Sequence, residues 1–124
     1  MKLFIMLGSI SALFGVALGA FGAHGLKSRV APEQLTIWQT GVQYHLVHAI
    51  ALVLVGILCQ VLAPTPLLRG AGWSFLIGTV LFSGSLYLLV LSGVRTMGAI
   101  TPFGGLAFLL GWLLLALAAL RCSN

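Results

Sequence analysis

Four long stretches of this chain carry no charged side chain, and this feature limits the possible folds more than any other. They cover residues 3–23, 42–62, 71–91 and 101–120, each about the 20 residues that a helix needs to cross the hydrocarbon core of a membrane. Of the 124 residues, 60% are hydrophobic and 6% are charged, whereas a soluble domain carries about 25% charged residues. The sequence therefore predicts an all-α integral membrane four-helix bundle, with residues 1–124 as a single transmembrane domain.

Proline and arginine positions separate the predicted spans. Pro64 and Pro66 end the second stretch, because proline cannot continue the helical hydrogen-bond ladder. One helix over residues 71–120 would be roughly 75 Å long and would place Arg95 in mid-membrane, at a cost of roughly 3 kcal/mol. Two spans are therefore predicted there. Four spans in total put both termini on the same side of the membrane.

The residues before the second span predict a short amphipathic helix at the membrane surface, over residues 32–41. Pro32 suits the first turn of a helix, and Glu33 is favourable near the positive end of the helix dipole. The apolar positions recur at helical spacing and include Trp38, which is expected to anchor this helix at the interface. Gly41 predicts a bend into the second span.

Small residues form a regular face on the first span. A Gly-x-x-x-Gly spacing of this kind lets two helix backbones approach closely in a membrane, where no hydrophobic effect joins helices. We expect this face to pack against another helix. Its members are Gly8, Ser11, Gly15, Gly19 and Gly22.

The charged residues are few and scattered. The six Lys and Arg side chains lie at the ends of the apolar stretches, where they mark the membrane surface and do not form the basic stripe that nucleic acid requires. Three fall on each side of the predicted topology, so their count leaves the orientation open. Glu33 is the single acidic residue, which excludes catalysis by paired carboxylates. We expect neither nucleic-acid binding nor enzyme activity, and no catalytic residue is assigned.

The predicted topology gathers polar side chains at one membrane face. We interpret them as a cluster that hydrogen-bonds across helices and fixes their packing. An alternative is a metal or haem site, because imidazole suits several transition metals; it would use His24, His45 and His48, although no cofactor is expected. The cluster comprises His24, Gln43, Tyr44, His45, His48, Tyr87 and Thr101.

Three classes of function follow from these features. The first is a non-catalytic protein that binds membrane lipids or a membrane protein complex, since basic and aromatic side chains near an interface suit lipid headgroups. The second is a homo-oligomeric channel or small transporter, and the third is the metal- or haem-binding protein. The residues expected to contact lipid or a partner are Trp38, Arg95, Lys27 and Arg29.

Several short segments resemble those of one protein family. They are GAFGAH at 19–24, WQTGVQYH at 38–45, FSGSLY at 82–87 and TPFGG at 101–105, and in this order they resemble the YgdD-like family of small inner-membrane proteins, which has mitochondrial relatives. The resemblance implies a four-span protein of the bacterial plasma membrane with both termini in the cytoplasm. It implies no reaction and no catalytic residue.

Overall fold

The computed structural model describes residues 2–122 and is helical along almost all of that range, with no strand in it. Two five-residue segments are π-helical, and one short segment is 3₁₀-helical. In chain order the elements are α1 (Leu3–Phe21), η1 (Gly22–Leu26, π), α2 (Pro32–Val61), α3 (Pro66–Gly78), η2 (Thr79–Ser83, π), α4 (Gly84–Ser92), η3 (Arg95–Ala99, 3₁₀) and α5 (Thr101–Cys122).

These elements join into four rods that can each cross a membrane. The rods are Leu3–Leu26, Pro32–Val61, Pro66–Ser92 and Arg95–Cys122, with 24 to 30 residues each. At about 1.5 Å per residue even the shortest exceeds the roughly 30 Å hydrocarbon core. The predicted all-α membrane bundle is therefore confirmed. We call Pro66–Ser92 the third span, because α3, η2 and α4 follow one another in it without a break.

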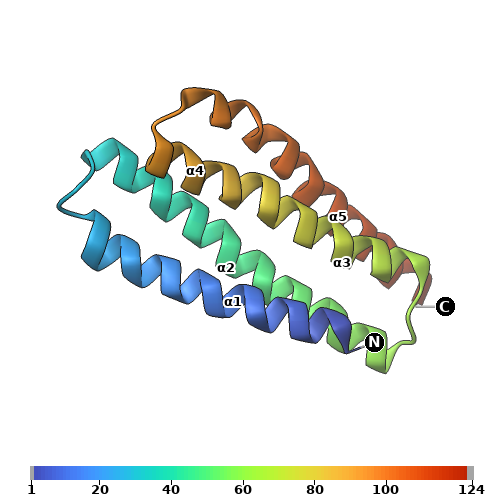
Figure 1. Ribbon diagram of the computed structural model, residues 1–124. Coiled ribbons are helices and arrows are strands. Elements are labelled where there is room, and N and C mark those ends of the chain that lie inside the picture. Colours follow the sequence, from blue (N-terminus) through green and yellow to red (C-terminus); the bar gives the residue numbers. More distant parts are fainter. Residues whose placement is uncertain (1, 123–124) are drawn as a thin grey trace.

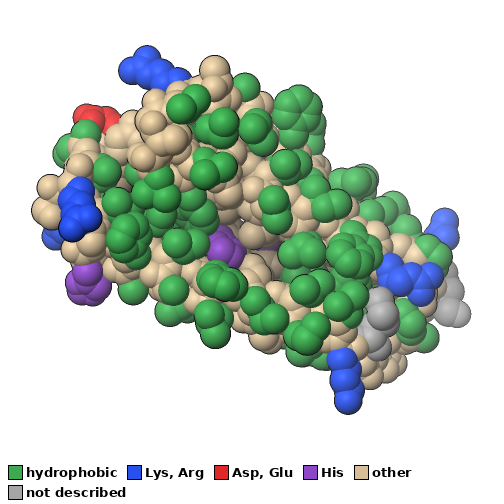
Figure 2. Space-filling view, in the orientation of Figure 1, with side chains coloured by type: hydrophobic (Ala, Val, Ile, Leu, Met, Phe, Trp, Pro, Cys, Tyr) green, Lys and Arg blue, Asp and Glu red, His purple; other side chains and the backbone are tan. Residues whose placement is uncertain are grey.

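The four rods lie side by side, and α1 begins at the same end of the molecule at which α5 ends (Figure 1). α2 and the third span form the centre: α1 packs on α2, and α5 packs on α3 and η2. Charged side chains gather at the two ends of the molecule, while apolar side chains cover the surface between them (Figure 2). This distribution matches a bundle whose middle faces hydrocarbon.

Local sequence signals explain where the central helices start and stop. Pro32 is the first residue of α2, after an extended Ala31. At the start of α3 the Thr65 hydroxyl accepts a hydrogen bond from the Leu68 amide at 3.2 Å, with Pro66 at the first helical position. The third span ends at Ser92 and is capped by Gly93, whose φ of 72° favours glycine. The Thr65 cap and Pro66 explain why the third span starts at residue 66, five residues before the predicted start at 71.

The bend predicted at Gly41 is wrong. Residues 32–61 form one continuous helix, so residues 32–41 are the first turns of α2 and are not a separate helix. Gly41 serves close packing instead: a Cβ there would lie 3.0 Å from the Tyr87 ring, and the Ser83 hydroxyl donates to the Gly41 carbonyl at 2.7 Å. A glycine in a membrane helix therefore marked a close contact and not a hinge.

The small-residue face of α1 packs against α2. A Cβ added at Gly8 would lie 2.8 Å from the Val53 amide nitrogen, and one added at Gly22 would lie 2.6 Å from the Trp38 ring. At Gly15 and Gly19 the nearest atoms also belong to α2 side chains. These glycines let the two backbones approach more closely than larger side chains would allow.

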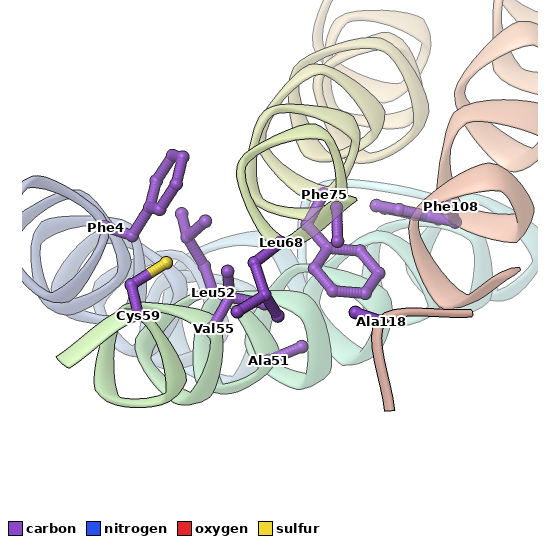
Figure 3. Close-up of a cluster of buried hydrophobic side chains, with 10 residues drawn as sticks. Phe4, Ala51, Leu52, Val55, Cys59, Leu68, Phe75, Phe108 and Ala118 are labelled. Carbon is purple, nitrogen blue, oxygen red and sulfur yellow. The ribbon is translucent and has the colours of Figure 1, made fainter. Parts of the chain in front are cut away.

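The apolar core has two parts. The larger part lies toward the end that carries the chain termini and joins all four spans through ten buried residues, Phe4, Ala51, Leu52, Val55, Cys59, Leu68, Ala71, Phe75, Phe108 and Ala118 (Figure 3). The smaller part lies toward the opposite end and is built from Leu26, Trp38 and Val90. Between them, α2 and the third span carry buried polar side chains.

Gly104 makes the tightest contact between α5 and the third span, so it provides a test of the packing. A Cβ at position 104 would lie 2.7 Å from the Phe82 Cα, whereas one at Gly105 would meet nothing closer than the Phe82 ring at 4.0 Å. We expect Gly104→Ala to lower the free energy of unfolding by about 1–3 kcal/mol. Gly105→Ala is the matched control and should be neutral or stabilising, because alanine favours helix. Unfolding in mild detergent, followed by circular dichroism, measures both, and equal effects would contradict this packing.

Candidate functional site

A layer of buried polar side chains separates the two parts of the core. On α2, His45 and His48 lie between Trp38 of the smaller core and Ala51 of the larger one. On the third span, Thr79 and Ser83 occupy the corresponding stretch and belong to the π-helical segment η2. Such π-helical segments inside α-helices are frequent at functional sites. The layer is therefore the first place to look for one.

His45 links three helices through both of its ring nitrogens. Its Nε2 lies 3.0 Å from the Ser11 hydroxyl on α1, and its Nδ1 lies 2.9 Å from the Tyr87 hydroxyl on α4. The imidazole is only 6% exposed. Each hydroxyl can donate or accept, so the geometry permits either neutral tautomer of His45.

His48 is held in one tautomer. Its Nδ1 lies 2.8 Å from the Tyr44 carbonyl, which can only accept, so Nδ1 carries the hydrogen and donates. The Trp112 indole N–H on α5 donates to Nε2 at 3.0 Å. The imidazole also stacks on the Phe108 ring, with centroids 3.6 Å apart. His48 therefore joins α2 to α5 as a neutral side chain.

Three further hydrogen bonds cross between helices. The Trp38 indole N–H donates to the Leu18 carbonyl at 2.9 Å, Ser83 donates to Gly41 as described above, and the Ser85 and Thr101 hydroxyls lie 2.6 Å apart. Together with the histidine contacts, they connect every pair of neighbouring spans. Polar side chains inside the bundle thus pair with one another or with backbone carbonyls, as a membrane interior requires.

The polar cluster predicted at one membrane face is only partly assembled. His45 and Tyr87 meet, and His48 contacts Tyr44. Thr101 contacts Ser85 instead of a histidine, while the His24 and Gln43 side chains are exposed. His45 is also deeper than predicted, because α2 begins at Pro32, about 20 Å of helix earlier.

The alternative of a metal site built from His24, His45 and His48 is wrong for this arrangement. Among residues 2–122 no three His, Cys, Asp or Glu side chains gather closely enough to hold a metal ion. Histidine appears in Figure 2 at one end of the molecule and, separately, in a hollow among apolar side chains. His45 and His48 also use both ring nitrogens in hydrogen bonds. The three histidines therefore do not form one site.

The structure also corrects the role of Trp38. Its side chain is 1% exposed and packs between the Phe21 and Tyr87 rings, so it is a core residue and does not contact lipid. The other three residues predicted to bind lipid or a partner, Lys27, Arg29 and Arg95, are exposed. They lie in the two connections at the end of the molecule opposite the chain termini. The basic side chains remain available to a headgroup there.

A groove opens between α1 and the third span beside His45. It has a volume of about 340 Å³, and we call it the lateral groove. α1 contributes Phe14 and Leu18 to its walls, and the third span contributes Val80 and Gly84. Ser11, His45, Thr79, Ser83 and Tyr87 also line it. Because the polar atoms of these residues contribute little to its surface, the groove is almost entirely apolar and can hold a lipid chain.

A second groove lies on the other side of α2, toward α5. Its volume is about 570 Å³, and aromatic side chains dominate it, including Tyr44, Phe108 and Trp112. His48 lines this groove too, but its ring nitrogens are both used. We call it the aromatic groove. Both grooves expose mainly apolar surface.

Sequence reasoning missed several members of the polar layer. Ser11 was assigned to helix packing, yet its hydroxyl contacts His45. Ser83, Ser85 and Trp112 were not assigned to any site. The available signal was a hydroxyl or indole group inside an apolar span, where an unpaired polar group is costly. Their partners depend on helix rotation, which a single sequence does not reveal.

Comparison with known proteins identifies the family. The model of a family described as "Protein of unknown function (DUF423)" matches residues 18–105. The chain is 48% identical over 121 residues to the UPF0382 membrane protein YwdK of Bacillus subtilis (strain 168), covering 98% of both chains. It is 42% identical to a UPF0382 membrane protein of Staphylococcus epidermidis (strain ATCC 12228 / FDA PCI 1200), covering all of both. The chain belongs to the DUF423/UPF0382 family of membrane proteins. No solved structure matches it.

Membership of the DUF423/UPF0382 family supports the sequence-based interpretation at a coarse level. The prediction of a small membrane protein family holds, and the relatives are named as membrane proteins. Their names state no ligand, reaction or partner. The function must therefore be inferred from the polar layer and the grooves.

The contact between Trp112 and His48 can be tested by removing one donor. Trp112→Phe leaves His48 Nε2 without its N–H partner, and we expect the free energy of unfolding to fall by about 0.5–1.5 kcal/mol. Trp73→Phe is a matched control, because Trp73 is exposed to a similar degree, 43% against 42%. The Trp73 indole N–H makes no hydrogen bond within residues 2–122. Unfolding in mild detergent measures both; a loss no larger for Trp112→Phe than for the control would argue against the bond.

Proposed function

We propose that this chain is a non-catalytic membrane protein that binds a membrane lipid in the lateral groove. The observation that carries this proposal is the groove itself, which opens beside the buried His45 and has almost entirely apolar walls. The two apolar core clusters flank it along α2 and the third span. A lipid chain would lie against Phe14, Leu18 and Val80, which match hydrocarbon in polarity.

The charges at the end opposite the termini support a lipid ligand. Lys27, Arg29 and Arg95 are exposed there. Cationic side chains at a membrane surface attract anionic headgroups, and a guanidinium can bind a phosphate through two parallel hydrogen bonds. A phospholipid would therefore find its chain site and its headgroup site on one molecule.

The chemistry of the described residues favours binding over catalysis. His45 and His48, the histidines within the spans, are held by helix-to-helix hydrogen bonds through both ring nitrogens. The chain has one acidic residue, Glu33, which lies in the first turn of α2 and not in the groove. Neither histidine therefore has a carboxylate side chain beside it with which to form a general acid and base pair.

The same proposal places the protein in the bacterial plasma membrane with both chain termini in the cytoplasm. The named relatives come from Bacillus and Staphylococcus. Kinship with the YgdD-like proteins, which suggested this orientation, is part of the proposal. The tie between three basic residues at each end makes a direct test of the orientation necessary.

Filling the lateral groove should displace the lipid. Gly84 lines it, and a Cβ there would meet nothing within 4 Å, so Gly84→Leu adds a side chain without a clash at its first atom. We expect this variant to keep its fold and to retain several-fold less lipid than the unchanged protein when purified in mild detergent and weighed by native mass spectrometry. The control is Gly105→Leu, which fills the aromatic groove and should keep its lipid. Unchanged lipid retention in a folded Gly84→Leu variant would refute the proposed site.

The orientation has its own test. With both termini in the cytoplasm, a green fluorescent protein fused after residue 124 should be fluorescent, and alkaline phosphatase fused there should be inactive, because the phosphatase needs an oxidising compartment to form its disulfides. Fusions to the connection between η1 and α2 should give the opposite pattern. Active phosphatase at the C-terminus would reverse the proposed orientation.

A further inference from the structure

We propose that two copies of this chain form a symmetric dimer in the membrane through the outward face of α2, with their Gln43 side chains hydrogen-bonded to each other. This inference goes beyond the proposed lipid binding and does not depend on it. It rests on one exposed amide at hydrocarbon depth and on the spacing of the apolar side chains that follow it along α2.

The outward face of α2 carries a narrow stripe of exposed side chains. Successive members are alternately four and three residues apart, an average of 3.5, which is the spacing that lets two helices pack along each other in a left-handed coil. The five apolar members are between 44% and 72% exposed. We call this set the α2 stripe; it comprises Gln43, Val47, Ile50, Leu54, Ile57 and Val61.

The α2 stripe is open because the rest of the bundle occupies other sides of the helix. α1 packs against α2 where Gly8 meets Val53, and the third span packs against it where Tyr87 meets Gly41. Neither the lateral groove nor the aromatic groove includes a residue of the stripe. A partner can therefore lie along the stripe while both grooves stay open to lipid.

Gln43 is the polar member of the stripe, and it lies at hydrocarbon depth. α2 has 30 residues, or about 45 Å, so it extends about 7.5 Å beyond each edge of a roughly 30 Å core. Gln43 follows Pro32, the first residue of α2, by about 16 Å of helix. Its Cα then lies about 9 Å inside the edge. The amide cannot reach water from that depth.

The Gln43 amide has no hydrogen-bond partner within residues 2–122. The Thr36 and Thr40 hydroxyls of the same helix differ in this respect, because they donate to backbone carbonyls one turn earlier, at 3.1 and 3.0 Å. An unpaired amide in hydrocarbon is costly, since no water replaces the missing bonds. A molecule that covers the stripe and offers a donor and an acceptor at this depth removes the cost.

A second copy of the chain meets both requirements, whereas acyl chains meet neither. Copies inserted in the same orientation are related by a two-fold axis along the membrane normal, so each residue of one stripe lies at the depth of its counterpart. The Gln43 amide has a partially positive N–H end and a partially negative carbonyl end. It is therefore complementary in charge to the Gln43 amide of the second copy, and each can donate to the other.

The apolar members of the stripe suit a helix-to-helix seam. Val47, Ile50, Ile57 and Val61 are β-branched, and such side chains have few rotamers to lose when they pack. A single polar residue in an apolar seam also fixes the register, because any shift along the helix separates the two amides. The stripe therefore specifies one parallel arrangement.

Förster transfer in liposomes tests the dimer. Full-length protein is labelled with donor or acceptor dye at Cys122, which is exposed, whereas Cys59 is buried, and transfer is recorded at decreasing protein-to-lipid ratios. We expect a saturable transfer that fits a monomer–dimer equilibrium. Gln43→Leu should weaken dimerisation about 3- to 30-fold, the range for a hydrogen bond between membrane helices. Transfer no greater than that of randomly distributed copies would overturn the proposal.

The matched control is Gln60→Leu. Gln60 is exposed on the same helix, one residue before its end, where water can hydrogen-bond the amide, so this change should leave dimerisation as it is. Gln43→Asn keeps an amide and should restore part of the loss. Because Gln43 is exposed and unpaired in one copy, all three variants should keep the helix content of the unchanged protein, measured by circular dichroism. Equal weakening by Gln43→Leu and Gln60→Leu would contradict the amide pair.

Oxidative cross-linking locates the interface without changing Gln43. Ile50→Cys puts a thiol on the α2 stripe, and Leu113→Cys puts one on α5 at a similarly exposed position, 58% against 56%. Both carry Cys122→Ser, which removes the exposed native thiol. In the membranes of expressing cells, copper phenanthroline should give a covalent dimer of Ile50→Cys and none of Leu113→Cys. A dimer through Leu113→Cys alone, or through neither, would overturn the assignment of the interface to α2.

Discussion

Hydrogen bonds between helices hold the centre of this molecule together. In a membrane the outside of a helix bundle is as apolar as its inside, so the hydrophobic effect gives helices little reason to associate. Two other interactions remain: close packing, which glycines such as Gly8 and Gly104 permit, and polar contacts, of which those of His45 and His48 are the most connected. Both act over short distances and require one particular rotation of each helix. They therefore specify the arrangement as well as stabilise it.

The sequence was sufficient to predict the fold class and insufficient to predict the site. Apolar length and the scarcity of charge gave four spans, because the solvent of a membrane imposes both requirements on any helix that crosses it. Pro32 marked a helix start correctly, since the missing N–H has a fixed structural consequence. Pro66 was used only to end the second span, although it is also the first residue of α3. Gly41 was misinterpreted, because a glycine permits both a bend and a close contact and the sequence does not distinguish them.

The depth and the partners of the histidines could not be predicted for related reasons. The depth of His45 depends on where α2 begins, and the assumed bend placed that start at residue 42, ten residues after the observed start at Pro32. Its partners depend on the rotation of α1 and α4 about their axes, which many small packing contacts determine together. Trp38 illustrates the same limit. The apolar side of an amphipathic helix can face either the protein core or lipid, because both are apolar, and the Trp38 side chain is in fact buried in the core.

The polar layer connects stability with the proposed binding. A chain of two hydroxyls around one imidazole can satisfy both ring nitrogens only by leaving one hydroxyl hydrogen unpaired. A bundle built only for stability would be better served by placing an acceptor, such as a backbone carbonyl, at that end; Thr79 and Ser83 have such acceptors in the Phe75 and Gly41 carbonyls. Ser11 and Tyr87 differ from these two hydroxyls in lacking one while lining the same groove. Within this layer, therefore, Thr79 and Ser83 are tied to backbone carbonyls, whereas Ser11 and Tyr87 are tied to the His45 imidazole.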